Sequence, residues 1–285
     1  MKLGLQIPSF TFPDGPAGLG SDLATIARGA DEAGFEYLAV MDHFFQIPGV
    51  GPVDQEMLEA YTTLGFLAAH TERVKLLTVI TGVLYRSPGL LAKAVTTLDV
   101  LSGGRAVLGI GAGWNEVESR GLGMPFPPVK ERFELLEDAL EFCLRMWSGD
   151  DGPYDGRHVH AGRLLNVPQA LSKPHPPIMI GGGGEKKTLR LVAKYADACN
   201  MFDIPELPHK LEVLREHCEN EGRSYDDITK TVYTSYGREP AELLENLHRL
   251  SGLGVSAVIG AMPQVYDPKQ IDIFATEVIP AAEKI

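Results

Sequence analysis

Cysteine is scarce in this sequence of 285 residues, and the three that occur, Cys143, Cys199 and Cys218, stand far apart. No Cys-x-x-Cys pair is present to clip a metal or exchange disulfides, so we expect three reduced thiols in the core. Positive charge is also in deficit, since 26 Lys and Arg face 38 Asp and Glu for a net charge of −12. Because neutralising phosphates needs a basic face, a nucleic-acid partner is not expected.

Long hydrophobic runs are missing as well. Residues Met1 to Ile7 lead at once into a polar loop, and no stretch approaches the roughly 18 apolar residues of a membrane-spanning helix. We therefore expect a cytoplasmic protein that does not bind membranes. The motifs Gly-x-Ser-x-Gly and His-Glu-x-x-His are absent, which argues against a hydrolase. His158 and His160 have no third ligand at a suitable spacing, so no metal site is expected.

The chain instead alternates short apolar runs rich in β-branched residues with longer stretches of helical period. This alternation is typical of repeated βα units around a parallel sheet. Eight strands are expected, at residues 2–8, 36–41, 74–81, 105–110, 177–181, 197–201, 229–236 and 256–260. Eight βα pairs predict an α/β fold of the (β/α)8 TIM-barrel type, with a doubly wound open sheet as the structural alternative.

A helix is expected after each strand. The predicted helices cover residues 20–33, 57–71, 88–101, 129–147, 185–195, 206–221, 240–252 and 269–282. One segment, about 148–176, is too long for an ordinary loop between a helix and a strand. We interpret it as an insertion with a short hairpin between helix four and strand five, within a single domain that covers residues 1–285.

The ends of the strands carry the chemistry, because the loops after them build the active site of a barrel. Strand five runs into Gly181, Gly182, Gly183 and Gly184, followed by Glu185 and Lys186. Glycines that enter a helix let backbone amides approach an anion, so this turn is a candidate phosphate cradle. The alternative is a flexible turn that only caps the helix. No Gly-Lys-Ser/Thr follows, which excludes a P-loop.

Asp42 and His43 follow strand two and form the most plausible proton-handling pair, since imidazole titrates near neutrality. The alternative is a pair that satisfies backbone groups where the strand ends. Phe44 and Phe45 are candidates for the wall of an apolar pocket, and Gln6 leaves strand one beside it.

The order and spacing of five motifs resemble the luciferase-like monooxygenase superfamily, and within it the actinobacterial oxidoreductases that use the deazaflavin coenzyme F420. The likeness covers nearly the whole chain. The motifs are residues 41–44 (MDHF), 81–93 (TGVLYRSPGLLAK), 97–105 (TLDVLSGGR), 108–114 (LGIGAGW) and 173–184 (KPHPPIMIGGGG).

This resemblance implies a (β/α)8 barrel with the cofactor ring across the ends of the strands. The phosphate is then expected near Gly181 to Lys186, and the ring edge near Asp42, His43 and Thr81, with Gly113 and Trp114 as further cofactor contacts. A bulge at Thr78 and Val79 is expected to back the ring, commonly through a non-prolyl cis peptide. The resemblance also suggests a homodimer.

The sequence departs from the deazaflavin sugar-phosphate dehydrogenases, which place a carboxylate where this chain has Trp114. Glu116 and Glu118 are candidates for a displaced carboxylate, or for capping a helix. Trp114 favours a flat, apolar substrate over the ring.

The resemblance thus favours hydride transfer between F420 and a small apolar or conjugated substrate, with His43 as acid/base and Asp42 or Glu116 as further catalytic candidates. The first alternative is a monooxygenase of the same fold that uses FMN. The second is a protein that binds deazaflavin or flavin without catalysis.

Overall fold

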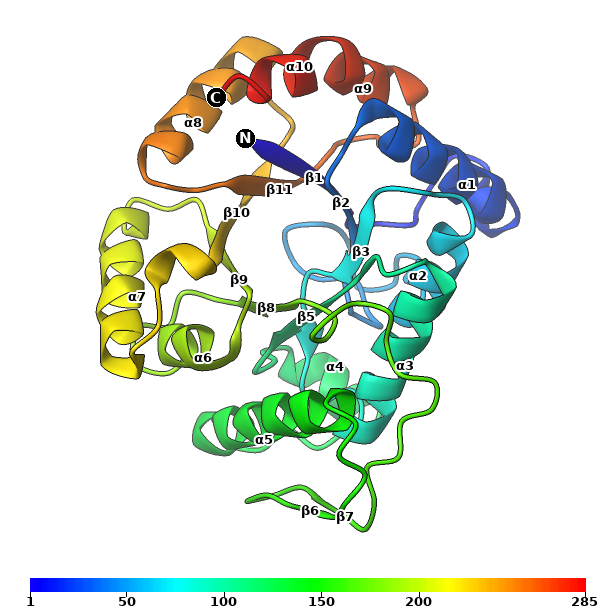
Figure 1. Ribbon diagram of the computed structural model, residues 1–285. Helices are drawn as coiled ribbons and strands as arrows, with labels where there is room; N and C mark the ends of the chain where they lie inside the picture. The colour runs from blue at the N-terminus through cyan, green and yellow to red at the C-terminus, as the bar shows by residue number, and fades with distance from the viewer.

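Eight parallel strands close into a barrel in the computed structural model, which describes residues 1–285 (Figure 1). The strands are β1 (Lys2–Ile7), β2 (Tyr37–Val40), β3 (Lys75–Thr78), β5 (Ala106–Gly111), β8 (Ile178–Gly181), β9 (Ala198–Phe202), β10 (Thr229–Ser235) and β11 (Ala257–Ala261). Pairing of β3 with β5, with Leu76 opposite Ala106, closes the circle. The predicted barrel is therefore confirmed, and the open sheet is not formed.

One predicted strand is split. The run 74–81 ends as β3 at Thr78 and resumes as the two-residue strand β4 (Thr81–Gly82), which pairs with the end of β5. The interruption at residues 79 and 80 leaves two side chains at the mouth of the barrel.

Helices surround the barrel, as the ring of ribbons in Figure 1 shows. They are α1 (Gly15–Ala33), α2 (Ala60–Ala68), α3 (Pro88–Leu101), α4 (Glu116–Gly121), α5 (Val129–Trp147), α6 (Thr188–Tyr195), α7 (Leu207–Glu221), α8 (Pro240–Gly252), α9 (Pro268–Ile273) and α10 (Ile279–Ala282), with the 3-10 helix η1 (Tyr225–Asp227) and the π-helix η2 (Phe274–Val278). None of them is both long and apolar enough to cross a membrane.

Local sequence explains several helix boundaries. Gly34 ends α1 with a φ of 91°, a left-handed conformation that glycine adopts without strain, and its amide donates to carbonyls of the last turn. The Glu59 side chain accepts from the amides of Tyr61 and Thr62, so α2 begins at Ala60 instead of residue 57. The short helix α4 was not predicted.

The core has two parts. A large cluster fills the space between the barrel and its helices, and a cluster of eight buried residues fills the barrel itself. The inner cluster comprises Tyr37, Ala39, Leu77, Val107, Met179, Ala198, Ala257 and Ile259, with Val79 and Ile80 packed against it. The barrel is therefore plugged, and a ligand can only lie across its end.

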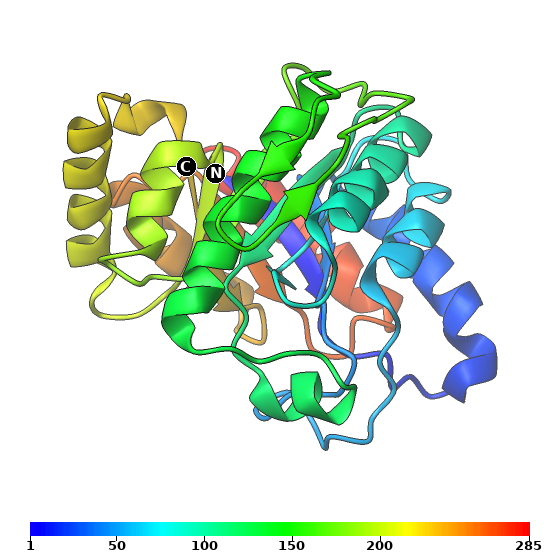
Figure 2. The same cartoon turned by 90° about the horizontal axis from the view of Figure 1, so that it is seen from below.

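The segment between α5 and β8 contains the antiparallel hairpin of β6 (Tyr154–Asp155) and β7 (His160–Ala161). The Asp138 carboxylate on α5 accepts from three consecutive backbone amides of this hairpin, those of residues 157–159. Figure 2 shows the hairpin packed along α5, and α4 at the bottom edge beside the blue loop that follows β2.

Candidate active site

A cavity of about 560 Å³ opens at the carboxyl ends of the barrel strands. Half of its 24 lining residues are hydrophobic, and none is Lys, Arg, Asp or Glu. The lining consists of Gln6, Met41, His43, Ile47, Pro48, Gly49, Val50, Val79, Ile80, Thr81, Gly82, Tyr85, Gly111, Ala112, Gly113, Trp114, Phe133, Leu136, Gly181, Gly182, Thr188, Asn200, Phe202 and Tyr233. Such a site suits a flat, mostly apolar ligand.

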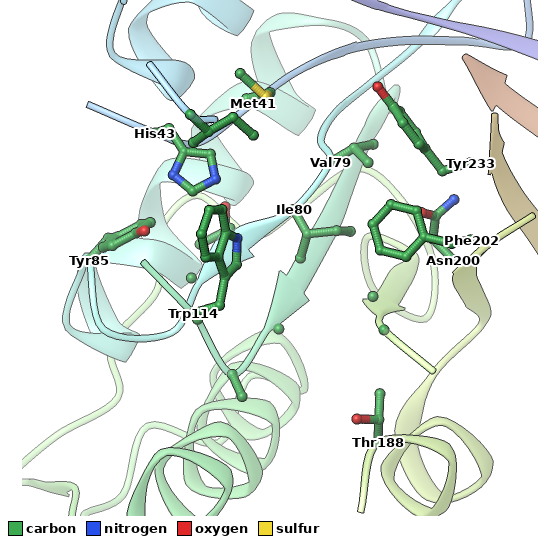
Figure 3. Close-up of a pocket in the computed structure, with 18 of the residues that line it drawn as sticks. Met41, His43, Val79, Ile80, Tyr85, Trp114, Thr188, Asn200, Phe202 and Tyr233 are labelled. Carbon is green, nitrogen blue, oxygen red and sulfur yellow. The ribbon is translucent and has the colours of Figure 1, made fainter. Parts of the chain in front are cut away.

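Val79 and Ile80 form the floor of this cavity and rest on the inner core of the barrel (Figure 3). The peptide bond between them is cis, one residue later than the expected Thr78–Val79 position. The Val79 amide still donates to the Val40 carbonyl at 2.9 Å, which keeps Thr78 paired with β2. The strand is therefore interrupted one peptide bond later than predicted. The Val79 carbonyl accepts from Gln6 Nε2 at 3.0 Å.

Glycines keep this floor flat. A Cβ placed on Gly181 would lie 2.5 Å from Ile80 Cγ1, and one on Gly111 would lie 3.3 Å from Ile80 Cγ2. Gly182 has a φ of 115°, which an L side chain rarely adopts. These positions therefore exclude side chains both by contact and by backbone conformation.

Aromatic side chains stand on either side of the floor. Trp114 is 59% exposed and Phe202 is 62% exposed, although both line the cavity. Figure 3 shows Ile80 between them, with Tyr233 beside Phe202 at a ring distance of 5.9 Å. Large apolar faces left open to solvent in a concave site are available to a ligand.

His43 lies at the edge of the cavity, with its ring 5.4 Å from that of Trp114. Its Nδ1 lies 3.1 and 3.2 Å from the two carboxylate oxygens of Glu118 on α4. Burial raises the pKa of Glu118, but hydrogen bonds from His43, Tyr85 and the Phe45 amide outweigh it and hold the pKa below its ordinary value. The carboxylate is therefore ionised near neutrality.

Asp42 lies behind the cavity instead of lining it. Asp42 is 1% exposed, and its two carboxylate oxygens accept hydrogen bonds from the two terminal nitrogens of Arg86, at 2.6 and 3.0 Å. Arg86 also pairs with Glu59 and stacks on the Tyr61 ring at 4.7 Å. This bidentate pair anchors the loop after β2, so the expected proton-handling role of Asp42 is not supported by its position.

Thr78 and Thr81 are both fully buried, and only Thr81 of this threonine pair borders the cavity. Their hydroxyls lie 2.7 Å apart, and Tyr61 OH lies 3.1 Å from Thr81 Oγ1. The pair therefore joins the Arg86 network to the floor of the site.

The predicted phosphate turn is only partly at the cavity. Gly181 and Gly182 line it, but Gly183 and Gly184 do not. α6 begins at Thr188, three residues later than predicted, because the residues before it form an open turn. The cation at this turn is Lys210 of α7, which was not predicted from the sequence and which donates to the Gly183 carbonyl at 2.9 Å.

The two charged residues of the predicted cradle point elsewhere. Glu185 pairs with Lys210 at 3.3 Å and with His209 at 3.7 Å, and Lys186 is exposed. Neither lines the cavity. The positive charge beside the N-terminus of α6 therefore comes from Lys210 of α7 and not from Lys186 of the turn.

Three further candidates lie outside the cavity lining. Glu116 is half-exposed and pairs with Arg120 at 2.7 Å, because the first turn of α4 directs it away from Glu118. Phe44 packs edge-on against Tyr85 at 5.3 Å, and Phe45 lies against Gly121. The carboxylate at the site is therefore Glu118. Phe45 packs against α4 and Phe44 against Tyr85, so neither forms the pocket wall.

Asn200, Phe202 and Tyr233 also line the cavity and were not predicted from the sequence. They lie toward the carboxyl ends of β9 and β10, so the rule that strand ends build the site of a barrel applies to them as well. Gln6, His43, Val79, Thr81, Gly113 and Trp114 were predicted and do line the cavity.

Comparison with known proteins agrees with this geometry. The sequence profile described as luciferase-like monooxygenase matches residues 1–270. The chain belongs to the luciferase-like monooxygenase family. A curated relative, the F420-dependent glucose-6-phosphate dehydrogenase of Kineococcus radiotolerans, is 30% identical over 97% of this chain and 80% of its own length.

Two solved structures share the barrel. The coenzyme F420-dependent tetrahydromethanopterin reductase of Methanopyrus kandleri superposes with a TM-score of 0.81 at 18% identity and covers 98% of both chains. An F420-dependent secondary alcohol dehydrogenase, solved with an F420–acetone adduct, has a TM-score of 0.81 at 19% identity and covers 99% of both chains. At these identities the likeness demonstrates the fold.

Proposed function

We propose that this chain is an F420-dependent oxidoreductase that transfers a hydride between the deazaflavin and a small neutral, mostly apolar substrate. The observation that carries the proposal is a cavity with a flat floor, aromatic sides and one histidine, in a chain whose curated relative is named for F420 dependence. The proposal concerns both the cofactor and the class of substrate.

The residues present fit a planar tricyclic group. Val79 and Ile80 supply an apolar support, and Gly111 and Gly181 carry no Cβ that would collide with Ile80 and displace it. Gly182 has no side chain to block a ligand from its backbone, and Lys210 at the same turn, which also pairs with Glu185, is a cation that can face an anionic tail. This fit makes the turn after β8 the proposed phosphate contact.

The deazaflavin supplies the hydride acceptor or donor when it is bound, and the protein supplies orientation and proton transfer. Trp114 and Phe202 flank the floor and offer apolar faces to a bound ring. When a substrate alcohol is oxidised, its carbon loses a hydride and its hydroxyl loses a proton. His43 is the titratable imidazole on the cavity edge that accepts this proton, and it returns the proton in the reverse direction.

The substrate class follows from charge. A sugar phosphate carries two negative charges, and Arg or Lys side chains are the usual partners of phosphate. No such side chain lines this cavity, and Trp114 presents a broad apolar face to it. A neutral alcohol, ketone or conjugated carbonyl therefore fits better than the phosphorylated substrate for which the curated relative is named.

The test is a redox assay that follows the absorbance of F420 in the presence of paired compounds. Each pair consists of a neutral alcohol or carbonyl and its phosphorylated analogue, and reduced FMN with oxygen is run in parallel. We expect turnover with F420 and neutral members only. Oxygen consumption with FMN would instead identify a monooxygenase, and tight F420 binding without any turnover would identify a non-catalytic binder.

We also propose that the chain forms a homodimer in the cytoplasm. Leu90 and Leu101 of α3 are exposed, as are Leu165 and Val167 in the segment that Lys93 fastens to this helix. The three cysteines are free and buried, as expected in a reducing compartment. Sedimentation equilibrium tests the dimer, and a monomer at every concentration would refute it.

A further inference from the structure

Glu118 is the most deeply buried carboxylate at the site, with no exposed side-chain surface. Its polar neighbours include two backbone amides, the Tyr85 hydroxyl and the His43 ring. Its Oε2 accepts from the amides of Phe44 and Phe45 at 2.9 and 3.1 Å, and its carboxylate faces His43 Nδ1. α4 and the loop after β2 are thus joined across 75 residues by one side chain.

The protonation state of Glu118 determines which group carries the hydrogen between Glu118 and His43 Nδ1. An ionised carboxylate has no hydrogen and can only accept, so the imidazole nitrogen facing it must carry the hydrogen. The lowered pKa of Glu118 supports the ionised form. In a neutral imidazole the second nitrogen then has a free lone pair.

That second nitrogen, Nε2 of His43, has no hydrogen-bond partner within the chain. Nε2 is not a buried atom without a partner, because Arg132 Nε is the one side-chain polar atom of that kind. His43 lines the cavity, and Figure 3 shows its ring above Trp114. Nε2 is therefore accessible from the cavity.

We infer that Glu118 is a positioning residue that locks neutral His43 in the Nδ1–H tautomer and so presents Nε2 to the cavity as a hydrogen-bond acceptor. The inference rests on the proposed function for its consequence, which is that the site selects a substrate that donates a hydroxyl hydrogen to His43. The same carboxylate stabilises the imidazolium once the proton has moved to Nε2.

The Glu118→Gln variant distinguishes this role from mere support of the loop. Glutamine has a single oxygen, and the two backbone amides that meet Oε2 hold that oxygen in its place. The amide NH2 group then occupies the Oε1 position, 3.1 Å from His43 Nδ1, where it can only donate. The oxygen lies 3.2 Å from the same Nδ1, but the two backbone amides already use both of its lone pairs. We therefore expect His43 to accept at Nδ1 and to carry its hydrogen on Nε2.

The experiment is 15N–1H correlation NMR of the imidazole nitrogens in the cofactor-free protein, with His43 assigned by its loss in His43→Gln. A protonated and an unprotonated ring nitrogen resonate in different regions, so the tautomer is read directly. In the wild type at a pH where His43 is neutral, we expect Nδ1 to be protonated and Nε2 to be free. In Glu118→Gln we expect the two assignments to exchange.

Glu134→Gln is the matched control, because Glu134 accepts from another histidine, His158, at 2.9 Å on the outer face of the molecule. It should alter the His158 signals and leave those of His43 unchanged. An Nε2–H tautomer in the wild type would overturn the inference even if Glu118→Gln failed to fold. An unchanged tautomer in folded Glu118→Gln would do the same and would assign Glu118 a structural role only. Neither result depends on F420, so the proposed function is tested separately.

Discussion

Gly181→Ala tests whether the flat floor holds the cofactor. The new Cβ would lie 2.5 Å from Ile80 Cγ1 and 3.0 Å from its Cδ1, closer than real Cβ contacts allow. Ile80 rests on the filled interior of the barrel, so it can move only upward into the cavity. In the free protein this movement meets empty space, whereas in the complex it displaces the ring.

The cost of such overpacking is typically about 1–3 kcal/mol, and it appears here in the binding step. It corresponds to a rise of roughly 5- to 150-fold in the Kd for F420. A fluorescence titration with F420 measures it, and thermal melting checks that the fold is retained.

Gly65→Ala on α2 is the control, since a Cβ there meets nothing within 4 Å and Gly65 does not line the cavity. It should bind F420 nearly as well as the wild type. Equal affinities for the two variants would refute the placement of the ring on Ile80.

Three further predictions concern the site and its support. His43→Ala should lower the single-turnover rate by roughly 100- to 10,000-fold with little change in the Kd for F420, and a parallel loss of both would show that His43 only positions the ring. Asp42→Ala leaves the buried Arg86 guanidinium without its bidentate partner and should lower the free energy of unfolding by about 3–5 kcal/mol in urea titrations, a loss that a near-unchanged midpoint would contradict. The pKa of Glu118 is lower in the folded chain, so its contribution to stability is complete above its unfolded pKa of about 4.3 and is lost as the pH falls through the folded value. Wild-type stability should therefore fall more steeply below pH 4.3 than that of Glu118→Gln, as urea titrations at several pH values would show.

The barrel could be predicted from the sequence because each βα unit is encoded locally. Apolar strands, amphipathic helices and glycines such as Gly34 mark the eight units within a few residues. The ends of the strands then indicated Gln6, His43 and Trp114, since barrel topology places all strand ends on one face.

Contacts between distant segments could not be predicted in the same way. Glu116 and Glu118 cannot be told apart from the sequence, because both are glutamates in the same short segment. Only the position of the six-residue helix α4 places Glu116 at the surface and Glu118 against His43. Asp42 was assigned to catalysis because it stands beside His43 at the end of a strand. Its ion pair with Arg86, 44 residues away in the sequence, has no local signal.

The most direct test of the account is a crystal structure of this chain with F420 bound. We predict the tricyclic ring on Val79 and Ile80, between Trp114 and Phe202, with the phosphate at Gly182 and His43 at the substrate side. A ring bound elsewhere, or FMN bound on this floor under conditions where F420 is excluded, would contradict the central claim.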